Sequence, residues 1–237
     1  MRTCAFLFAF ASSAFGQVSF EVVSLKPVER RLAAPVIRED GGRLEYRPAN
    51  LFRLLRRAYG LQSYQISGPA WLKDSFYDIV ATFPKGATRA DIPAMLQRMM
   101  AERFHLTVHR ETRMTPVYAI TVGKDGPKLD PCEGDACPKN RAVTVGEESM
   151  VIQASTVAYL AMGLQDGADR PVMDRTGLAG NFKIDMQCAQ QNAMPERSST
   201  QPSMSMALQK LGLKLAARRE EIEYLIVDGG NRVPVEN

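Results

Sequence analysis

The sequence is poor in the residue types on which enzyme active sites most often depend. Its 237 residues include two histidines, four cysteines and one tryptophan. The esterase pattern Gly-x-Ser-x-Gly does not occur, and no glycine-rich segment has the residue order of a phosphate-binding loop. Basic residues number 30 against 26 acidic ones, an excess too small to indicate nucleic-acid binding. The composition therefore gives no support to the common esterase, nucleotide-binding and nucleic-acid-binding classes.

The two histidines, His105 and His109, do not have the spacing of a metal site. They lie in the segment Phe-His-Leu-Thr-Val-His, whose aromatic and β-branched residues predict a strand. Histidines four residues apart on a strand share a face but stand ~13 Å apart, too far to bind one ion. We therefore expect both on the solvent face of a strand, and we predict neither a metal nor another cofactor.

Long hydrophobic runs are also absent, and none reaches the ~20 residues that a membrane-spanning helix needs. A short apolar run at 3–15 follows Arg2 and ends at Ala14-Phe15-Gly16, which has the small-x-small pattern of a signal-peptidase site. We expect residues 1–16 to be a signal peptide. The mature chain would then be periplasmic or secreted, with no membrane span.

Export would leave three cysteines in an oxidising compartment, Cys132, Cys137 and Cys188. Cys132 and Cys137 flank a short proline-bounded loop, so their local concentration favours a bridge between them. Chain entropy favours a longer bridge to Cys188, since the stabilisation grows with loop length. We favour Cys132–Cys137 and keep the pairing with Cys188 as the alternative. Three cysteines without a nearby fourth ligand do not indicate zinc.

The pattern of predicted elements repeats along the chain, each half running strand–helix–strand and then helix–strand–strand. In the first half these elements fall at 43–48, 51–59, 76–82, 92–103, 104–111 and 116–122. In the second half they fall at 150–153, 157–164, 182–186, 204–211, 213–217 and 222–228. The predicted fold class is α+β, with two similar halves whose helices pack on mixed or antiparallel sheets.

The domain organisation that we expect follows from this repeat. After the signal peptide, residues 17–130 form the first half, 131–148 a connecting loop that carries the cysteine pair, and 149–237 the second half. Residues 190–202 are rich in Gln, Ser, Met and Pro and have no apolar periodicity, so we predict a mobile loop there.

Five residues are candidates for a ligand site in the cleft between the halves. Tyr59 and Trp71, together with Tyr64 and the arginines of the helix at 51–59, can form a stacking platform, although a lone tryptophan also commonly closes the edge of a core. Asp174, Arg175 and Thr176 precede a glycine where a tight turn is expected. The structural alternative is that the Asp174 side chain fixes this turn by accepting backbone N–H groups or by pairing with an arginine.

Three arginines, Arg53, Arg56 and Arg57, fall opposite the apolar residues of the predicted helix at 51–59. We expect all three on the solvated face of this helix. An anionic ligand or a lipid headgroup at these arginines is the alternative.

Several strings of the sequence, taken in order, resemble one protein family. They are residues 20–27, 58–60, 64–72, 76–79, 103–106, 109–112, 116–119, 126–129, 170–180 and 211–215. Over nearly the whole mature chain they resemble the soil-associated family of secreted bacterial proteins, a domain of unknown function. Met173 and Ala179 depart from the Val and Thr usual in that family, and both changes leave the turn intact.

The resemblance implies no catalytic residue. Some relatives look fused to membrane metallopeptidases of the antibiotic-sensor type, which implies an extracytoplasmic sensing or binding role. We therefore expect a non-catalytic binding, sensing or interaction module whose partner is a small molecule, a peptide or an envelope protein. A secreted hydrolase that uses Asp174 or His109, and an envelope-assembly component, are the alternatives.

We predict that the exported form has the mass of residues 17–237 less two hydrogen atoms, because one disulfide forms after cleavage before Gln17. Intact-mass spectrometry of the secreted protein measures both events at once. A mass that still includes residues 1–16 would contradict the export argument.

Overall fold

The structure is a computed structural model that describes residues 18–29, 35–138, 142–146, 149–189 and 202–235. The expected signal peptide and nearly all of the expected mobile loop lie outside these residues. The described chain forms five α-helices and three four-stranded sheets, both mixed and antiparallel, so the α+β class is confirmed. The likeness of the two halves stays a prediction. None of the described helices has the length and apolar character required to cross a membrane.

Contacts between residues divide the chain into two compact units. The first unit contains residues up to 112 and from 223 onward, and the second contains residues 113–222. The chain therefore leaves the first unit, builds the second and returns. The sequence instead predicts two halves that follow one another along the chain, on either side of a connecting loop at 131–148. These domain limits stay a prediction.

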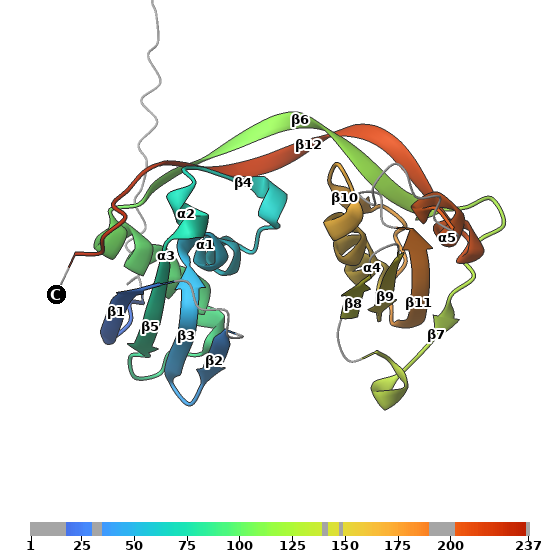
Figure 1. Ribbon diagram of the computed structural model, residues 1–237. Helices are drawn as coiled ribbons and strands as arrows, with labels where there is room; N and C mark the ends of the chain where they lie inside the picture. The colour runs from blue at the N-terminus through green and yellow to red at the C-terminus, as the bar shows by residue number, and fades with distance from the viewer. Residues whose placement is uncertain (1–17, 30–34, 139–141, 147–148, 190–201, 236–237) are drawn as a thin grey trace, which may run out of the picture. The chain divides into compact units, whose positions relative to one another are not determined.

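The first unit is built on an antiparallel sheet with the strand order β1-β5-β3-β2. These strands are β1 (Val22–Val28), β2 (Val36–Asp40), β3 (Arg43–Asn50) and β5 (Phe76–Thr82). The helices are α1 (Leu51–Tyr59), α2 (Trp71–Asp74) and α3 (Ile92–Phe104). Tyr77, Ile79 and Ala81 alternate along β5 and are buried, so one face of the sheet carries the core on which the helices pack (Figure 1).

The second unit contains a separate antiparallel sheet with the order β7-β11-β9-β8. These strands are β7 (Asp130–Pro131), β8 (Ala142–Val145), β9 (Ser149–Ala154) and β11 (Phe182–Ala189). The helices are α4 (Val157–Leu164) and α5 (Met204–Lys210). Ile152, Leu160 and Ile184 belong to the buried cluster of this unit, which joins the sheet to α4.

Helices α1 and α4 have the bounds that the sequence predicts, and their capping residues are confirmed. The Asn50 side chain accepts a hydrogen bond from the Arg53 backbone N–H at 2.9 Å. Gly60 ends α1 in the left-handed region, at a φ of 65°, which costs a glycine little. Thr156 caps α4 by accepting from the Tyr159 backbone N–H at 3.1 Å. Local capping chemistry thus fixes where both helices begin.

The sequence predicts separate strands at 104–111 and 116–122 and at 213–217 and 222–228, joined by short polar turns, and both turns are wrong. Residues 112–115 and 218–221 are extended and belong to two long strands, β6 (Thr107–Val122) and β12 (Leu213–Gly229). Three consecutive side chains are exposed on each strand there, at 112–114 and at 217–219. With no face buried, the apolar alternation typical of a strand is absent, and the polar residues resemble a turn.

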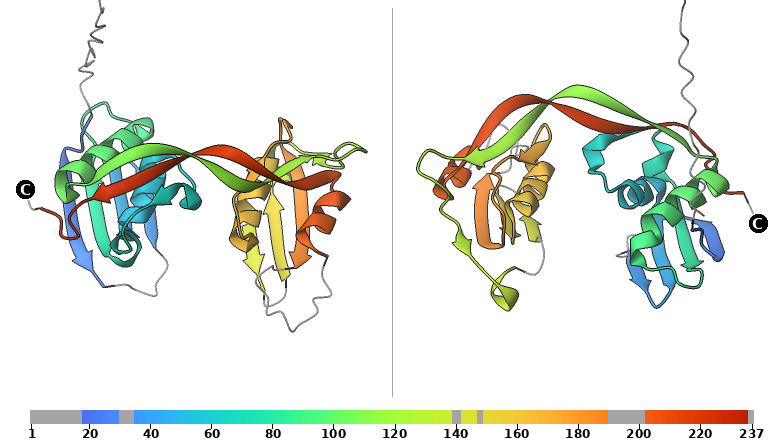
Figure 2. Two further views of the ribbon diagram at one scale, coloured as in Figure 1. Left: turned by 90° about the horizontal axis from the view of Figure 1, so that it is seen from above. Right: turned by 180° about the vertical axis from the view of Figure 1, so that it is seen from behind.

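The two long strands are neighbours in the third sheet, whose order is β10-β6-β12-β4. Its short outer strands are β4 (Ile66–Ser67) and β10 (Val172–Asp174), and Figure 2 shows β6 and β12 side by side. His109 lies in β6 and is exposed, as predicted. His105 does not lie in a strand, because α3 continues to the buried Phe104 and the chain then reverses at His105, with a φ of 48°.

A buried ionic cluster joins α1 to the sheet of the first unit. The Glu39 side chain on β2 is only 7% exposed, and Arg57 of α1 forks onto both its oxygens at 2.9 Å. Tyr46 of β3 donates its hydroxyl to the same carboxylate, and the exposed Arg89 reaches it at 3.4 Å. Arg57 therefore lies on the outer face of α1, with 37% of its side chain exposed, but its guanidinium binds Glu39 of β2, a strand that was not among the predicted elements.

The hydrogen bonds from Arg57, followed by the one from Tyr46, lower the pKa of Glu39 to about 2. Burial and the neighbouring carboxylate raise the pKa of Tyr46. At neutral pH the cluster therefore consists of a carboxylate, a guanidinium and a neutral phenol, which matches the hydrogen bonds present.

We predict that Arg57→Gln lowers the free energy of unfolding of the first unit by about 2 kcal/mol, because it leaves the Glu39 carboxylate buried without its main partner. Urea unfolding followed by the fluorescence of Trp71, the only tryptophan, reports on this unit. Arg89→Gln is the matched control, since Arg89 is 71% exposed, and it should cost less than about 0.5 kcal/mol. If both variants lose the same free energy of unfolding, Arg57 is not the main partner of the Glu39 carboxylate.

The pair of Glu39 and Arg57 also predicts how the free energy of unfolding depends on pH. The pKa of Glu39 is about 2 in the folded chain, against an ordinary value of 4.5, so its contribution is complete above pH 4.5 and is lost as the pH falls toward 2. The difference in stability between wild type and Arg57→Gln should shrink over this pH range. A difference that stays constant down to pH 2 would show that Glu39 does not titrate there.

Candidate functional site

A cavity of about 340 Å³ opens on the first unit beside α3. Small-molecule sites in proteins commonly measure ~300–1,000 Å³, so this one has room for a small ligand. Its lining is mostly apolar with a few polar groups: Tyr59, Ala94, Gln97, Arg98, Met100, Ala101, Leu106 and Val108.

One wall of the cavity is a single face of α3. Ala94, Gln97, Arg98 and Ala101 are spaced i, i+3, i+4 and i+7, which places them together on the helix surface. The two exposed alanines leave open the volume that longer side chains would fill. The Gln97 amide nitrogen donates to the backbone carbonyl of Ala58 at 2.7 Å, so this wall is tied to the end of α1.

The opposite wall comes from Tyr59 at the end of α1 and from the chain around the start of β6. Leu106 and Val108 are two residues apart in this extended segment and therefore face the same side. Burial raises the pKa of the half-buried Tyr59, and the positive charge of Arg110 opposes that rise. Tyr59 is thus a neutral phenol at neutral pH, and it can donate a hydrogen bond.

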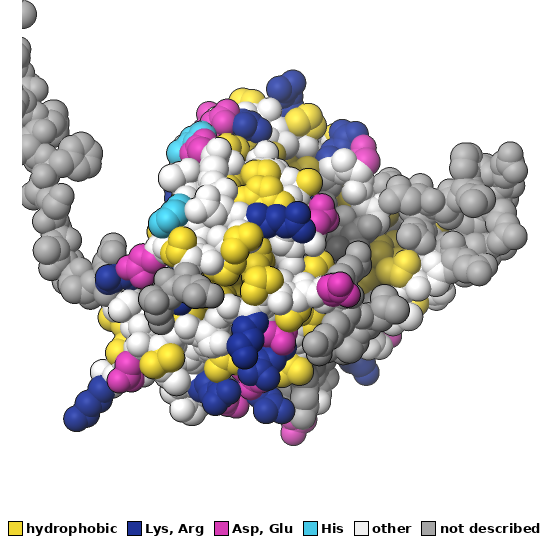
Figure 3. Space-filling view, turned by 60° about the vertical axis from the view of Figure 1, so that its left-hand side comes forward, with side chains coloured by type: hydrophobic (Ala, Val, Ile, Leu, Met, Phe, Trp, Pro, Cys, Tyr) yellow, Lys and Arg dark blue, Asp and Glu magenta, His cyan; other side chains and the backbone are white. Residues whose placement is uncertain are grey.

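Two exposed ion pairs lie near the cavity. Arg98 pairs with Glu102 on α3 at 2.6 Å, with 39% and 53% of the two side chains exposed. Arg110 lies two residues beyond Val108 on the same face of β6, and it pairs with Glu223 of β12. Figure 3 brings this side of the first unit toward the viewer, with hydrophobic and basic side chains next to one another.

The structure distributes the five candidate ligand residues over both units. Tyr59 lines the cavity, whereas Trp71 begins α2 and packs, partly buried, against the core of the first unit. Asp174, Arg175 and Thr176 lie in the second unit. A ligand site that includes all five residues stays a prediction.

The structural role considered for Asp174 is the one observed. Its carboxylate accepts hydrogen bonds from the Thr176 backbone N–H at 2.9 Å and from the Thr176 hydroxyl at 2.7 Å. The Thr176 hydroxyl oxygen in turn accepts from the Leu178 backbone N–H. Arg175 instead pairs with Glu220 of β12, at 2.6 Å. These contacts fix the turn and join it to the long strand.

The residues of the hydrolase alternative do not form a pair within either unit. His109 lies in the first unit, where its Nδ1 is 2.9 Å from the exposed carboxylate of Asp228, and Asp174 lies in the second. Within the described part of the chain, no group of three or more His, Cys, Asp and Glu residues could hold a metal ion.

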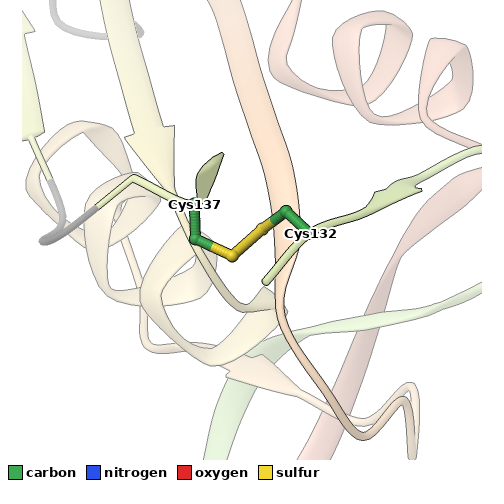
Figure 4. Close-up of a disulfide and its surroundings, with 2 residues drawn as sticks. All are labelled: Cys132 and Cys137. Carbon is green, nitrogen blue, oxygen red and sulfur yellow. A yellow bond between two sulfur atoms is a disulfide. The ribbon is translucent and has the colours of Figure 1, made fainter. Parts of the chain in front are cut away.

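The predicted disulfide between Cys132 and Cys137 is present, with the two Cα atoms 5.3 Å apart (Figure 4). Cys188 lies on β11 as a buried free thiol, and burial raises its pKa. The alternative pairing with Cys188 is therefore not the one formed. The short loop prevails because β11 holds Cys188 inside the core of the second unit.

Sequence reasoning found Tyr59 but missed the remainder of the cavity. The available signal was the spacing of Ala94 and Ala101, two small residues seven apart with Gln97 and Arg98 between them. That face is neither continuously apolar nor continuously charged. It becomes a wall only when Tyr59 and Val108 stand opposite it.

Comparison with known proteins gives a family and no function. A family model described as "Protein of unknown function (DUF3738)" matches residues 53–229, a range that includes the cavity lining and the Asp174 turn. No curated protein and no solved structure matches the chain.

We predict that Asp174→Ala speeds hydrogen exchange at the Thr176 and Leu178 amides and costs about 1 kcal/mol of stability, because the turn loses its acceptor. Asp174→Asn keeps an acceptor oxygen and should largely preserve protection. Asp169→Ala, which removes an exposed carboxylate paired with Arg170, is the control and should change neither amide. If the two amides stay equally protected from hydrogen exchange in Asp174→Ala, the Asp174 carboxylate does not fix this turn.

Proposed function

We propose, for a chain that belongs to the DUF3738 family of proteins of unknown function, a binding role without catalysis. The observation that carries this proposal is the cavity beside α3, whose volume and mostly apolar lining with a few polar groups fit a small-molecule site. The described lining contains no histidine, cysteine, serine or carboxylate. It can hold a ligand, and apart from the neutral phenol of Tyr59 it offers none of the usual nucleophiles and general bases.

We place this role outside the cytoplasm. The signal peptide expected at 1–16 supports export, and the Cys132–Cys137 disulfide supports an oxidising compartment, where such bridges persist. Of the partners considered, a small molecule fits best, because a cavity of about 340 Å³ encloses a small ligand better than a folded protein surface.

We also infer that the two units follow one plan. In each unit a capping residue, Asn50 or Thr156, stands directly before a helix that follows a strand, α1 after β3 and α4 after β9. The cavity beside α3 belongs to the first unit, so the proposed binding role assigns the ligand to one unit only.

We predict that Ala101→Leu abolishes binding in the cavity without unfolding the chain. Ala101 is exposed on α3, and leucine has nearly the helix propensity of alanine, so the variant fills space at little cost. Octanol is the probe, followed through the NMR signals of the Met100 and Val108 methyl groups, which should shift in the wild type and stay unchanged in the variant.

Ala158→Leu is the matched control, because Ala158 is exposed on α4 in the second unit. It should leave the shifts of Met100 and Val108 as they are in the wild type. If octanol moves neither signal in the wild type, or moves both equally in Ala101→Leu, the cavity is not the binding site.

A further inference from the structure

We infer that the ligand of this cavity is a small amphipathic carboxylate, with its apolar part inside and its charged group held by Arg98 and Arg110. This inference rests on the proposed binding role and specifies the class of ligand. Three features support it: the apolar interior of the cavity, the positive charge of the arginines and the exposure of the ion pairs that they form.

The interior of the cavity suits a hydrocarbon group. Met100 and Leu106 are 1% and 8% exposed, and Val108 continues the apolar surface along β6. Ala94 and Ala101 add aliphatic carbon without filling the space. Transfer of apolar ligand surface from water to these side chains would supply most of the binding free energy.

The charged side chain in the described lining is positive, and an exposed carboxylate of α3 pairs with it. Arg98 is the only charged residue among those described as lining the cavity, and no carboxylate lines it. Arg110 follows Val108 on the same strand face, so it lies beside the part of the lining that β6 contributes, and its charge acts on the Tyr59 hydroxyl. A carboxylate between them would meet a cation from α3 and a cation from β6.

The present partners of the two arginines leave them able to take a ligand. Glu102 and Glu223 are 53% and 46% exposed, and such solvated pairs contribute little to stability. The neutral phenol of Tyr59 supplies a further donor for a carboxylate oxygen. An ammonium ligand would have to displace an arginine from Glu102 or Glu223 to gain an anion.

Three probes of eight carbon atoms each separate charge from apolar contact: octanoate, octanol and octylamine. They are titrated into the full chain by NMR, with the Met100 and Val108 methyl groups as reporters. We expect octanoate to bind about fivefold more tightly than octanol, as one partly solvated charge contact allows. Octylamine should bind more weakly than octanol.

The variants Arg98→Gln and Arg110→Gln should each lower the ratio of octanoate affinity to octanol affinity, because each removes one cation from the carboxylate. Arg53→Gln is the matched control, because Arg53 is an exposed arginine of α1 that does not line the cavity. It lowers the net charge of the chain by the same amount and should preserve the preference.

Equal affinities for octanoate and octanol in the wild type would overturn the carboxylate assignment and leave the proposed binding role standing. The same holds if Arg53→Gln removes the preference as fully as Arg110→Gln, since the attraction would then come from net charge alone. If none of the three probes moves the methyl signals, the assignment fails together with the proposed function.

Discussion

The pairing of β6 with β12 is the constraint on which both units depend. β12 supplies Leu225 and Val227 to the core of the first unit and Leu213 to that of the second, while β6 supplies Ile120 to the second. Neither core is therefore complete until a strand from the end of the chain has joined it, and such contacts between distant segments are slow to form. The cavity depends on the same pairing, because the strand that carries Val108 is held by β12.

The elements that sequence reasoning placed correctly are those with local causes. The bounds of α1 and α4 follow from a capping side chain and from apolar spacing, both visible within a dozen residues. The role of Asp174 belongs to the same class, since the hydrogen bonds of its carboxylate reach only to Thr176. The long strands failed for the opposite reason: their exposed middle segments have no buried face, so nothing in the local pattern indicates that β6 has β12 as its neighbour.

The candidate site was predicted only as far as one residue, Tyr59. Helical periodicity shows which residues of α3 share a face, but it cannot show that this face stands opposite Val108 of a different element. The same limit explains Arg57. The apolar stripe of α1 correctly placed this side chain away from the buried leucines, yet the solvent side of that helix is partly occupied by Glu39 of β2.

Burial separates the structural ion pairs of the first unit from those that a ligand can use. The Arg57 guanidinium binds both oxygens of the Glu39 carboxylate, which is 7% exposed, so breaking this pair would leave a buried charge without its partner. Arg98 and Arg110 form pairs of the same chemistry with carboxylates that are about half exposed, and water compensates for their opening. Arg57 is thereby committed to the fold through the buried Glu39 carboxylate, whereas the pairs of Arg98 and Arg110 involve carboxylates that water already reaches.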